Sequence, residues 1–311
     1  MVRKHTRRAA KAAFAVSIGV ALLIGLTAGV AGAQRSSIAK KPTIVLGTKN
    51  FTEEYILGQL YGQALAAKGF HVVYKGNFGS SELADTAIRA HKMNFYPEYT
   101  GIIVLDLAKS TTFPPTAAAT YKAAQKYEQK HGLTLLKRTP FVDSDTFTML
   151  TSTAQKDGVK TISDMKKVAN FSYAALPECA TRITCLLGLK NVYGLSQVNF
   201  VPLGAISVYT LLDNGQVTAG DGFTTDPQQS SKKYTRLVDN KHIFGFQNVA
   251  PVLSKGLLRG SNGTQLAKIC NKVSSLLTIK AMRAMDKAAY VQKATPQAIA
   301  HGFLKANHLL K

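Results

Sequence analysis

Apolar and polar positions along the chain alternate between two spacings. Residues 43–47 form a short β-branched run, and residues 53–67 then place apolar side chains such as Ile56 and Leu60 on one helical face. The same alternation continues along the chain, with residues 93–101 expected as a strand that runs into a turn and a longer helix expected near 116–132. It starts again at Asp145, and a later helix is expected over 182–194. Short strands that alternate with helices predict mostly parallel sheets with covered faces, and therefore an α/β fold.

The last part of the chain has a different pattern, because from Gly256 it is almost wholly helical. We expect helices over 263–277, 280–292 and 295–310, packed back on one α/β unit. The full length is 311 residues, and single hydrophobic cores stop growing near ~250–300 residues. We therefore predict two lobes.

The composition supports a folded protein and gives it an unusual charge. The chain is 46% hydrophobic and 18% charged, which excludes a disordered chain, a coiled coil and a collagen-like repeat. Its net charge of +22 would suit nucleic acid, an anionic membrane or an acidic ligand. The Lys and Arg residues are spread over the whole chain and no aromatic-basic module is present, so we expect no nucleic-acid partner.

The N-terminal 33 residues have the pattern of an export signal. Five basic residues precede an apolar stretch that ends at Ala31-Gly32-Ala33, a small-residue cleavage sequence. An uncleaved membrane anchor is the alternative, because the apolar run approaches the ~18–20 residues that span a bilayer. Removing residues 1–33 leaves 34 basic and 17 acidic residues, a net charge of +17. We expect an exported protein with a polar linker over 34–41, located on the extracytoplasmic face of the membrane.

Three cysteines lie in this exported chain, where disulfides can form. Cys179 and Cys185 enclose a five-residue loop that is short enough to bridge, whereas Cys270 lies in a helical pattern and is expected to be buried and free. A metal site is the alternative for the pair, but it needs further His or Cys ligands nearby and the sequence offers none. We predict a disulfide and no metal.

The sequence lacks the common signatures of catalysis. It contains no GxxxxGK[ST], GxGxxG, HExxH or GxSxG motif, and its seven histidines are scattered. Glu53 and Glu54 open a helix, where negative charge complements the helix dipole. Asp143 and Asp145 are interpreted as turn formers. We expect no enzyme activity and no cofactor, and a secreted enzyme is a less favoured alternative.

A series of short motifs carries a resemblance to a known family. In chain order they are GTKNFTEEYILGQLYGQAL, GSSELADTAI, FYPEYTG, PFVDSDTFTML, PECATRITCLLGL, DGFTTD and FGFQNVAPV. Together they resemble the extracytoplasmic substrate-binding proteins of glycine betaine, choline and carnitine ABC importers, over about residues 42–311. The resemblance implies a type II periplasmic-binding fold, in which two α/β lobes joined by a two-strand hinge close around a ligand. Lobe 1 would comprise 42–143 and 245–311, and lobe 2 would be an insertion over 144–244.

The resemblance also implies how a betaine would be held. A quaternary ammonium has no N–H, so aromatic faces must hold it by cation–π attraction. Its carboxylate needs cations or backbone donors. In the family pattern, Lys49 and Arg182 stand where carboxylate-binding cations are expected, with a surface salt bridge as the alternative for each. Ser80 and Ser81 follow Gly79 and open a helix, either as an anion-binding site or as simple N-caps.

The aromatic positions match the family only in part. Tyr99 matches a tyrosine of the cage, but Phe147 and Phe223 stand where tyrosine is common, and Gln247 stands where an aromatic is often found. Phenylalanine keeps the π face and loses the hydroxyl. Both phenylalanines as plain core residues remain an alternative. These departures leave room for choline, carnitine or a histidine-derived betaine such as ergothioneine.

The sequence therefore predicts a monomeric solute-binding component of an ABC importer. Its partners would be a small quaternary-ammonium ligand and the membrane permease. A binding protein for an amino acid or another polar solute is the second hypothesis, because Gln247 and the incomplete set of tyrosines permit it.

Overall fold

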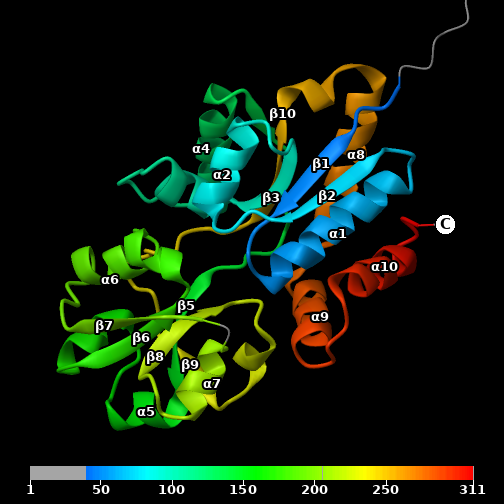
Figure 1. Ribbon diagram of the computed structural model, residues 1–311. Helices are drawn as coiled ribbons and strands as arrows, with labels where there is room; N and C mark the ends of the chain where they lie inside the picture. Colours follow the sequence, from blue (N-terminus) through cyan, green and yellow to red (C-terminus); the bar gives the residue numbers. More distant parts are fainter. Residues whose placement is uncertain (1–39, 205, 311) are drawn as a thin grey trace, which may run out of the picture. The chain divides into compact units, whose positions relative to one another are not determined.

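The computed structural model describes residues 40–204 and 206–310 (Figure 1). The predicted export signal at 1–33 and residues 34–39 of the predicted linker lie outside the described residues. Within those ranges, no helix combines the length and the apolar character needed to cross a membrane. The described strands form two five-stranded sheets, and we name lobe 1 and lobe 2 after them.

The sheet of lobe 1 has the strand order β2-β1-β3-β10-β4. Its strands are β1 (Ile44–Thr48), β2 (Val72–Asn77), β3 (Phe95–Tyr99), β4 (Leu133–Leu135) and β10 (Val249–Ser254). β1 pairs in parallel with β2 and β3, and β10 runs antiparallel to both β3 and β4. Four strands therefore share one direction, and only the last strand along the chain is reversed.

The sheet of lobe 2 repeats this arrangement, with the order β7-β6-β8-β5-β9. Its strands are β5 (Asp145–Leu150), β6 (Phe171–Ala175), β7 (Val198–Pro202), β8 (Ala219–Phe223) and β9 (Tyr234–Arg236). β6 is parallel to β7 and β8, whereas β5 is antiparallel to β8 and β9. The reversed strand is here the first along the chain.

Helices cover both faces of the first sheet. They are α1 (Thr52–Ala66), α2 (Ser81–Arg89), α3 (Thr100–Ile102), η1 (Ile103–Leu107), α4 (Ala117–Lys130), η5 (Lys255–Leu258), α8 (Gly260–Leu276), α9 (Ile279–Tyr290) and α10 (Pro296–Ala306). Side chains of α1 and α8–α10 share one buried cluster with Leu46 and Phe95, and those of α2, η1 and α4 share another with Tyr96 and Val252. Figure 1 shows α2 and α4 on the opposite side of the sheet from α1.

The helices of lobe 2 are shorter. They are α5 (Thr151–Lys156), η2 (Ile162–Lys167), η3 (Pro177–Thr181), α6 (Leu186–Asn191), α7 (Val208–Asp213) and η4 (Pro227–Ser230). The main core of this lobe gathers Phe147, Tyr173, Leu189 and Tyr193, which are fully buried. Large rings therefore supply much of its apolar contact area.

Two chain segments cross between the lobes side by side. Thr139 N donates to Val249 O over 2.8 Å, and Asp143 N donates to Gln247 O over 3.0 Å. One segment leads into β5 and the other into β10. Each enters its sheet from the other lobe, which explains why β5 and β10 are the reversed strands.

The prediction of a mostly parallel α/β fold is confirmed, with one reversed strand in each sheet. The long helices of the first and last parts of the chain also lie close to their predicted ranges. The segment after Tyr99 was expected to form a turn and instead continues as helix from Thr100 to Leu107. In lobe 2, the helix expected from Arg182 begins only at Leu186.

Candidate ligand-binding site

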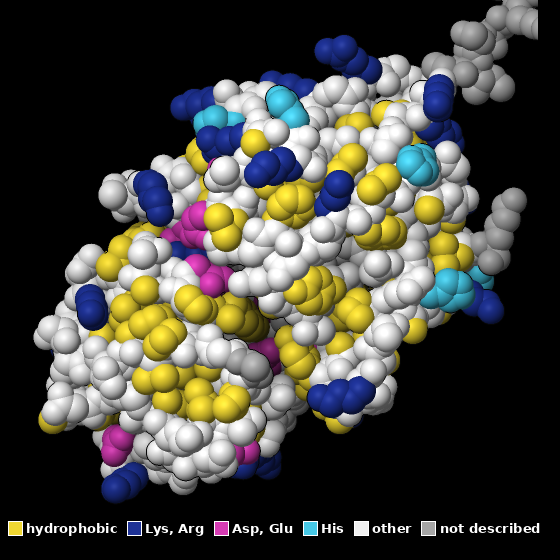
Figure 2. Space-filling view, in the orientation of Figure 1, with side chains coloured by type: hydrophobic (Ala, Val, Ile, Leu, Met, Phe, Trp, Pro, Cys, Tyr) yellow, Lys and Arg dark blue, Asp and Glu magenta, His cyan; other side chains and the backbone are white. Residues whose placement is uncertain are grey.

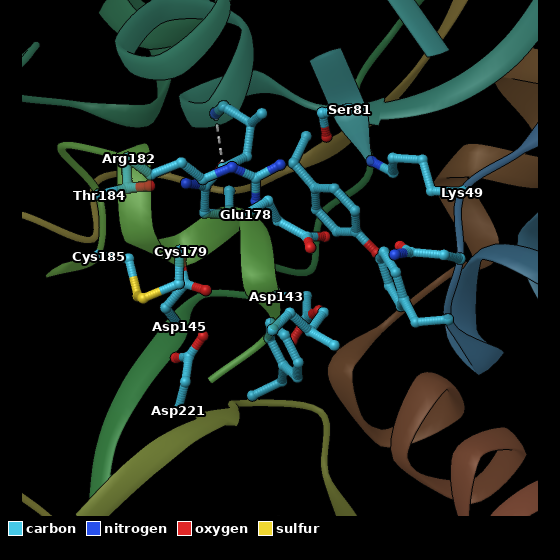
Figure 3. Close-up of a pocket in the computed structure, with 17 residues that line it drawn as sticks. Lys49, Ser81, Asp143, Asp145, Glu178, Cys179, Arg182, Thr184, Cys185 and Asp221 are labelled. Atoms are coloured by element: carbon cyan, nitrogen blue, oxygen red, sulfur yellow. Dashed lines mark hydrogen bonds between the residues drawn. A yellow bond between two sulfur atoms is a disulfide. The ribbon is translucent and has the colours of Figure 1, made fainter. Parts of the chain in front are cut away.

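A pocket opens where residues of both lobes face each other (Figure 3). Its empty space measures about 560 Å³, including the part open to solvent. Lobe 1 lines it with residues that follow β1 and β3 and with the start of α2, and lobe 2 lines it with the ends of β6 and β8 and with η3. In α/β sheets, ligands commonly bind outside the carboxyl ends of the strands.

Three aromatic rings face this pocket from both lobes. The centroids of Phe51 and Tyr99 are 6.0 Å apart, and those of Phe51 and Phe223 are 6.1 Å apart. The planes of Phe51 and Phe223 differ by only 8°, although one ring precedes α1 in lobe 1 and the other ends β8 in lobe 2. Parallel π faces from two lobes can hold an organic cation that has no hydrogen to donate.

Lys49 lies next to two of these rings, and its ammonium is already paired with carboxyl groups of the protein. Its ammonium contacts Glu98 and lies 3.5 Å from Glu54 Oε1, with these side chains at most 2% exposed. The same nitrogen lies 4.1 Å from the centroid of Tyr99 and 5.7 Å from that of Phe51. Burial raises the pKa of Glu54 to about 7, against the opposing charge of Lys49. Lys49, which was predicted to bind a ligand carboxylate, is thus paired with two carboxyl groups of its own lobe.

Glu53 and Glu54 do more than complement the helix dipole, because both are buried and bind side chains of the pocket. Glu53 is 3% exposed, and its Oε1 accepts from the Tyr99 hydroxyl over 2.7 Å. Burial, reinforced by the charge of Asp286, raises its pKa. The two glutamates fix Tyr99 and Lys49 at the edge of the pocket.

Arg182 approaches the pocket from lobe 2 and also has a partner. Its Nε and one terminal nitrogen each donate to Glu82 of α2 over 3.0 Å, which gives a two-pronged ion pair between the lobes. Although partial burial works in the other direction, these bonds and the charge of Arg182 lower the pKa of Glu82 to about 2. Next to it, Thr184 donates to Asp106 Oδ2 of lobe 1 over 2.6 Å.

The start of α2 faces the pocket through one of its two serines. Ser81 is 3% exposed and lines the pocket, while Ser80 is the N-cap residue and its hydroxyl donates to Glu82 Oε2 over 2.6 Å. Gly79 has a φ of +91°, which favours glycine. Glu82 lies in the first turn, so a carboxylate of the chain itself stands at this helix end.

Acidic side chains form the lobe 2 side of the pocket. Figure 3 shows the carboxyl groups of Asp145 and Asp221 pointing toward each other, and the two share a side-chain hydrogen bond. Burial raises the pKa of both, that of Asp145 to about 7. Asp143, in the crossing segment, accepts from Thr225 Oγ1 over 2.7 Å, and burial raises its pKa too. Asp143 and Asp145 were interpreted from sequence as turn formers. In the structure they line the pocket together with Asp221 and supply carboxyl groups to it.

Phe147 and Gln247 lie differently from the cage that was expected. Phe147 is fully buried, stacks on Tyr173 with centroids 5.0 Å apart and does not line the pocket. Gln247 lines it, but its Oε1 accepts from Ile102 N over 3.0 Å and its amide donates to the Phe244 carbonyl. A Cβ on Gly101 would lie 2.6 Å from that oxygen, so glycine gives the amide its room.

Cys179 and Cys185 form a disulfide, and both line the pocket on either side of Arg182. Cys270 is free and buried in lobe 1. Within residues 40–204 and 206–310, no group of three or more His, Cys, Asp or Glu side chains is arranged to hold a metal ion. The bridge closes the loop that carries Arg182 toward Glu82.

Sequence reasoning missed Phe51, Glu178 and the Asp145–Asp221 pair as parts of the pocket. Phe51 directly follows the Lys49-Asn50 dipeptide at the end of a strand, which was an available signal. The paired aspartates are 76 positions apart in sequence and meet only because β5 pairs with β8, with Asp145 opposite Phe223 and Phe147 opposite Asp221. No local spacing reveals that register.

Two α/β lobes, a pair of crossing segments and an aromatic, charged pocket between the lobes define a solute-binding protein of the periplasmic type. The family model described as the substrate binding domain of an ABC-type glycine betaine transport system matches residues 42–306. The chain belongs to this family of extracytoplasmic substrate-binding proteins, which is a transport family and not a class of enzymes.

Similar proteins agree with this assignment. A glycine-betaine-binding protein from Pseudomonas aeruginosa is 29% identical, with 93% of this chain and 96% of that protein covered. An ergothioneine transport permease and binding protein from Helicobacter pylori is 26% identical over 87% of this chain and 48% of its own length. A solved glycine betaine/carnitine/choline ABC transporter structure has a TM-score of 0.68 at 20% identity, covering 86% of this chain and 100% of that one. The predicted type II periplasmic-binding fold is confirmed.

Proposed function

We propose that this protein is the exported receptor of an ABC importer and binds one small quaternary-ammonium solute between its lobes. The observation that carries the proposal is the set of rings formed by Phe51, Tyr99 and Phe223. Phe51 and Phe223 keep exposed surface in the pocket, and they come from opposite lobes. A cation seated against these rings would gain ~0.5–2 kcal/mol from each ring that it contacts.

Lobe closure would then follow from the ligand itself. We assign 42–143 and 245–311 to lobe 1 and 144–244 to lobe 2, with the crossing segments near Asp143 and Gln247 as the hinge. A ligand that touches rings of both lobes favours the closed form by its differential affinity. The closed form would be what a permease recognises, and a monomer suffices for this role. No catalytic group is assigned.

The residues predicted from sequence have different roles in this proposal. Tyr99 and Phe223 belong to the cage, and Ser81 lies where it can donate to a polar group of the ligand. Phe147 supports lobe 2 from its core, and Gln247 holds the backbone of Ile102. Direct ligand contact by Lys49, Arg182, Ser80 or Gln247 stays a prediction, because each of their side chains has a partner within the protein.

Calorimetric titration with choline, glycine betaine, carnitine and ergothioneine tests the proposal. We expect saturable heat from at least one trimethylammonium compound, and a weaker response in Phe51→Leu than in Phe51→Tyr, which keeps an aromatic face. An amino-acid panel provides the comparison. Heat from an amino acid alone, or equal affinity in both Phe51 variants, contradicts the quaternary-ammonium assignment.

A further inference from the structure

Carboxyl groups outnumber cationic side chains around the pocket. Figure 2 shows acidic side chains along the hollow of the visible face, whereas most Lys and Arg lie around it. The pocket itself is lined by two cations, Lys49 and Arg182, and by four acidic residues. The acidic residues are Asp143, Asp145, Glu178 and Asp221. This contrasts with a protein whose net charge is +22.

Arg182 is the more accessible of the two cations, and Glu82 already occupies its donor edge. The two bonds of 3.0 Å use the fork geometry that a ligand carboxylate would need. Asp106 and Glu178 also raise the pKa of Arg182 through their charge, so further acidic groups surround the guanidinium. A ligand carboxylate that approached it would meet Glu82 and Glu178 at close range.

Lys49 offers no better place for a ligand carboxylate. Its ammonium lies between Glu98 and Glu54 and is covered by the ring of Tyr99, with 2% of its side chain exposed. Both cations that could neutralise a carboxylate are therefore matched by carboxyl groups of the protein.

Lobe 2 offers the pocket hydrogen-bond acceptors. Asp221 is 7% exposed and lines the pocket, and its Oδ1 has no hydrogen-bond partner within the described chain. Asp145, its neighbour, stands directly opposite Phe223 in the β5–β8 register, which places a carboxyl group beside a ring of the cage. Glu178 forms no ion pair in the described residues, and its side chain reaches the same space (Figure 3). Acceptors beside an aromatic cage suit a ligand that is cationic at one end and donates a hydrogen bond at the other.

We propose that the pocket selects a quaternary-ammonium ligand of net positive charge that carries a hydrogen-bond donor in place of a carboxylate, and that Glu82 sets this selectivity by occupying Arg182. The inference rests on the proposed function. The ligand's ammonium lies among Phe51, Tyr99 and Phe223, and its hydroxyl or equivalent donor faces Asp221. Glu82 is a positioning residue, because it acts on the ligand through Arg182.

Choline and glycine betaine make a matched pair of probes, because both carry a trimethylammonium group and they differ at the other end. In calorimetric titrations of the full protein we expect choline to bind at least about tenfold more tightly, the value of one lost charge-assisted hydrogen bond. Glu82→Gln frees the guanidinium and should reduce the choline-to-betaine ratio by about tenfold. Asp213→Asn removes an exposed acid that is paired with Lys233 and does not line the pocket, so it should leave the ratio unchanged.

Asp221→Asn provides a second test, which remains informative if Glu82→Gln does not fold. It should weaken choline binding several-fold and leave betaine binding nearly unchanged, and thermal unfolding of each variant confirms that it is folded. Tighter binding of betaine by the wild-type protein overturns the inference and leaves the proposed function intact. A ratio that Glu82→Gln and Asp213→Asn change equally overturns the role of Glu82. Absence of heat from every trimethylammonium compound overturns the proposed function as well.

Discussion

Lys49 and Glu98 form a buried ion pair that joins the end of one strand to the next strand in the same sheet. Lys49 directly follows β1 and Glu98 lies in β3, and these strands run parallel. The oxygen that contacts Lys49 also accepts from Tyr99 N over 2.7 Å. The pair therefore fixes the backbone beneath a ring of the cage.

Removal of Lys49 should destabilise the fold before it affects the ligand. Lys49→Met leaves Glu98 and Glu54 buried without a counter-ion, and breaking such a pair costs about 3–5 kcal/mol. The double variant Lys49→Met/Glu98→Gln should recover part of this loss. Urea unfolding followed by circular dichroism measures both, with the exposed Lys68→Met as control. A single variant as stable as the control would contradict the structural role of the pair.

Two phenylalanines of the lobe 2 sheet should respond differently to substitution, one in ligand affinity and the other in stability. Phe223→Leu removes a π face from the pocket and should weaken trimethylammonium binding by ~0.5–2 kcal/mol, with little change in stability. Phe147→Leu alters the packing on Tyr173 in the lobe 2 core and should lower the unfolding free energy by about 1 kcal/mol without changing affinity. Titration and unfolding of both variants separate the two roles. Loss of affinity in Phe147→Leu alone would reverse the assignment.

Asp145 links ligand binding to pH. Burial raises its pKa to about 7 against the effect of Arg182, with Asp106 adding to the rise. The ionised form attracts a cation, so choline affinity should increase as pH rises from 6 to 8, by up to about tenfold. The titration belongs to the Asp145–Asp221 pair, because the two groups share a hydrogen bond. In Asp145→Asn, choline affinity should change little with pH. A choline affinity of the wild-type protein that falls between pH 6 and pH 8 would contradict this coupling.

Local pattern was sufficient for much of the fold. The amphipathic runs that became α1, α4 and α8 are long, so their periodicity outweighs individual residues. The helix over 100–107 was missed because Gly101, Ile102 and Ile103 have modest helix propensity. Its first turn is held by contacts remote in sequence, including the Gln247 amide on Ile102 N.

The pocket could be predicted only where a motif marked it. Tyr99, Phe223 and Ser81 line the pocket, and each lies in a short string that carries the family pattern. The pairing of Lys49 with Glu98 and of Arg182 with Glu82 spans 49 and 100 positions. Such pairs depend on sheet register and on the approach of the lobes, which no local spacing encodes.

Glu128 gives the fold a pH dependence away from the pocket. It is fully buried in α4, neither carboxyl oxygen has a hydrogen-bond partner within the described chain, and burial raises its pKa to about 8, with Asp85 and Glu98 adding to the effect. In the unfolded chain the carboxyl group titrates near its ordinary pKa of 4.5. Between pH 4.5 and pH 8 the native state therefore keeps a proton that the unfolded state has released. Stability contributed by the neutral form is complete below pH 4.5 and is lost as pH rises toward 8.

Glu128→Gln removes this titration while keeping the shape of the side chain. Relative to the wild-type protein, the variant should gain unfolding free energy between pH 5 and pH 7.5, by about 3 kcal/mol at pH 7 if the full shift is expressed. Urea unfolding at several pH values measures the difference. Asp213→Asn, which removes an exposed acid outside the pocket, is the control for the loss of charge alone. A constant difference between Glu128→Gln and the wild-type protein at every pH would show that Glu128 has no raised pKa in the native state, because only a titration that differs between the folded and unfolded states can produce a slope.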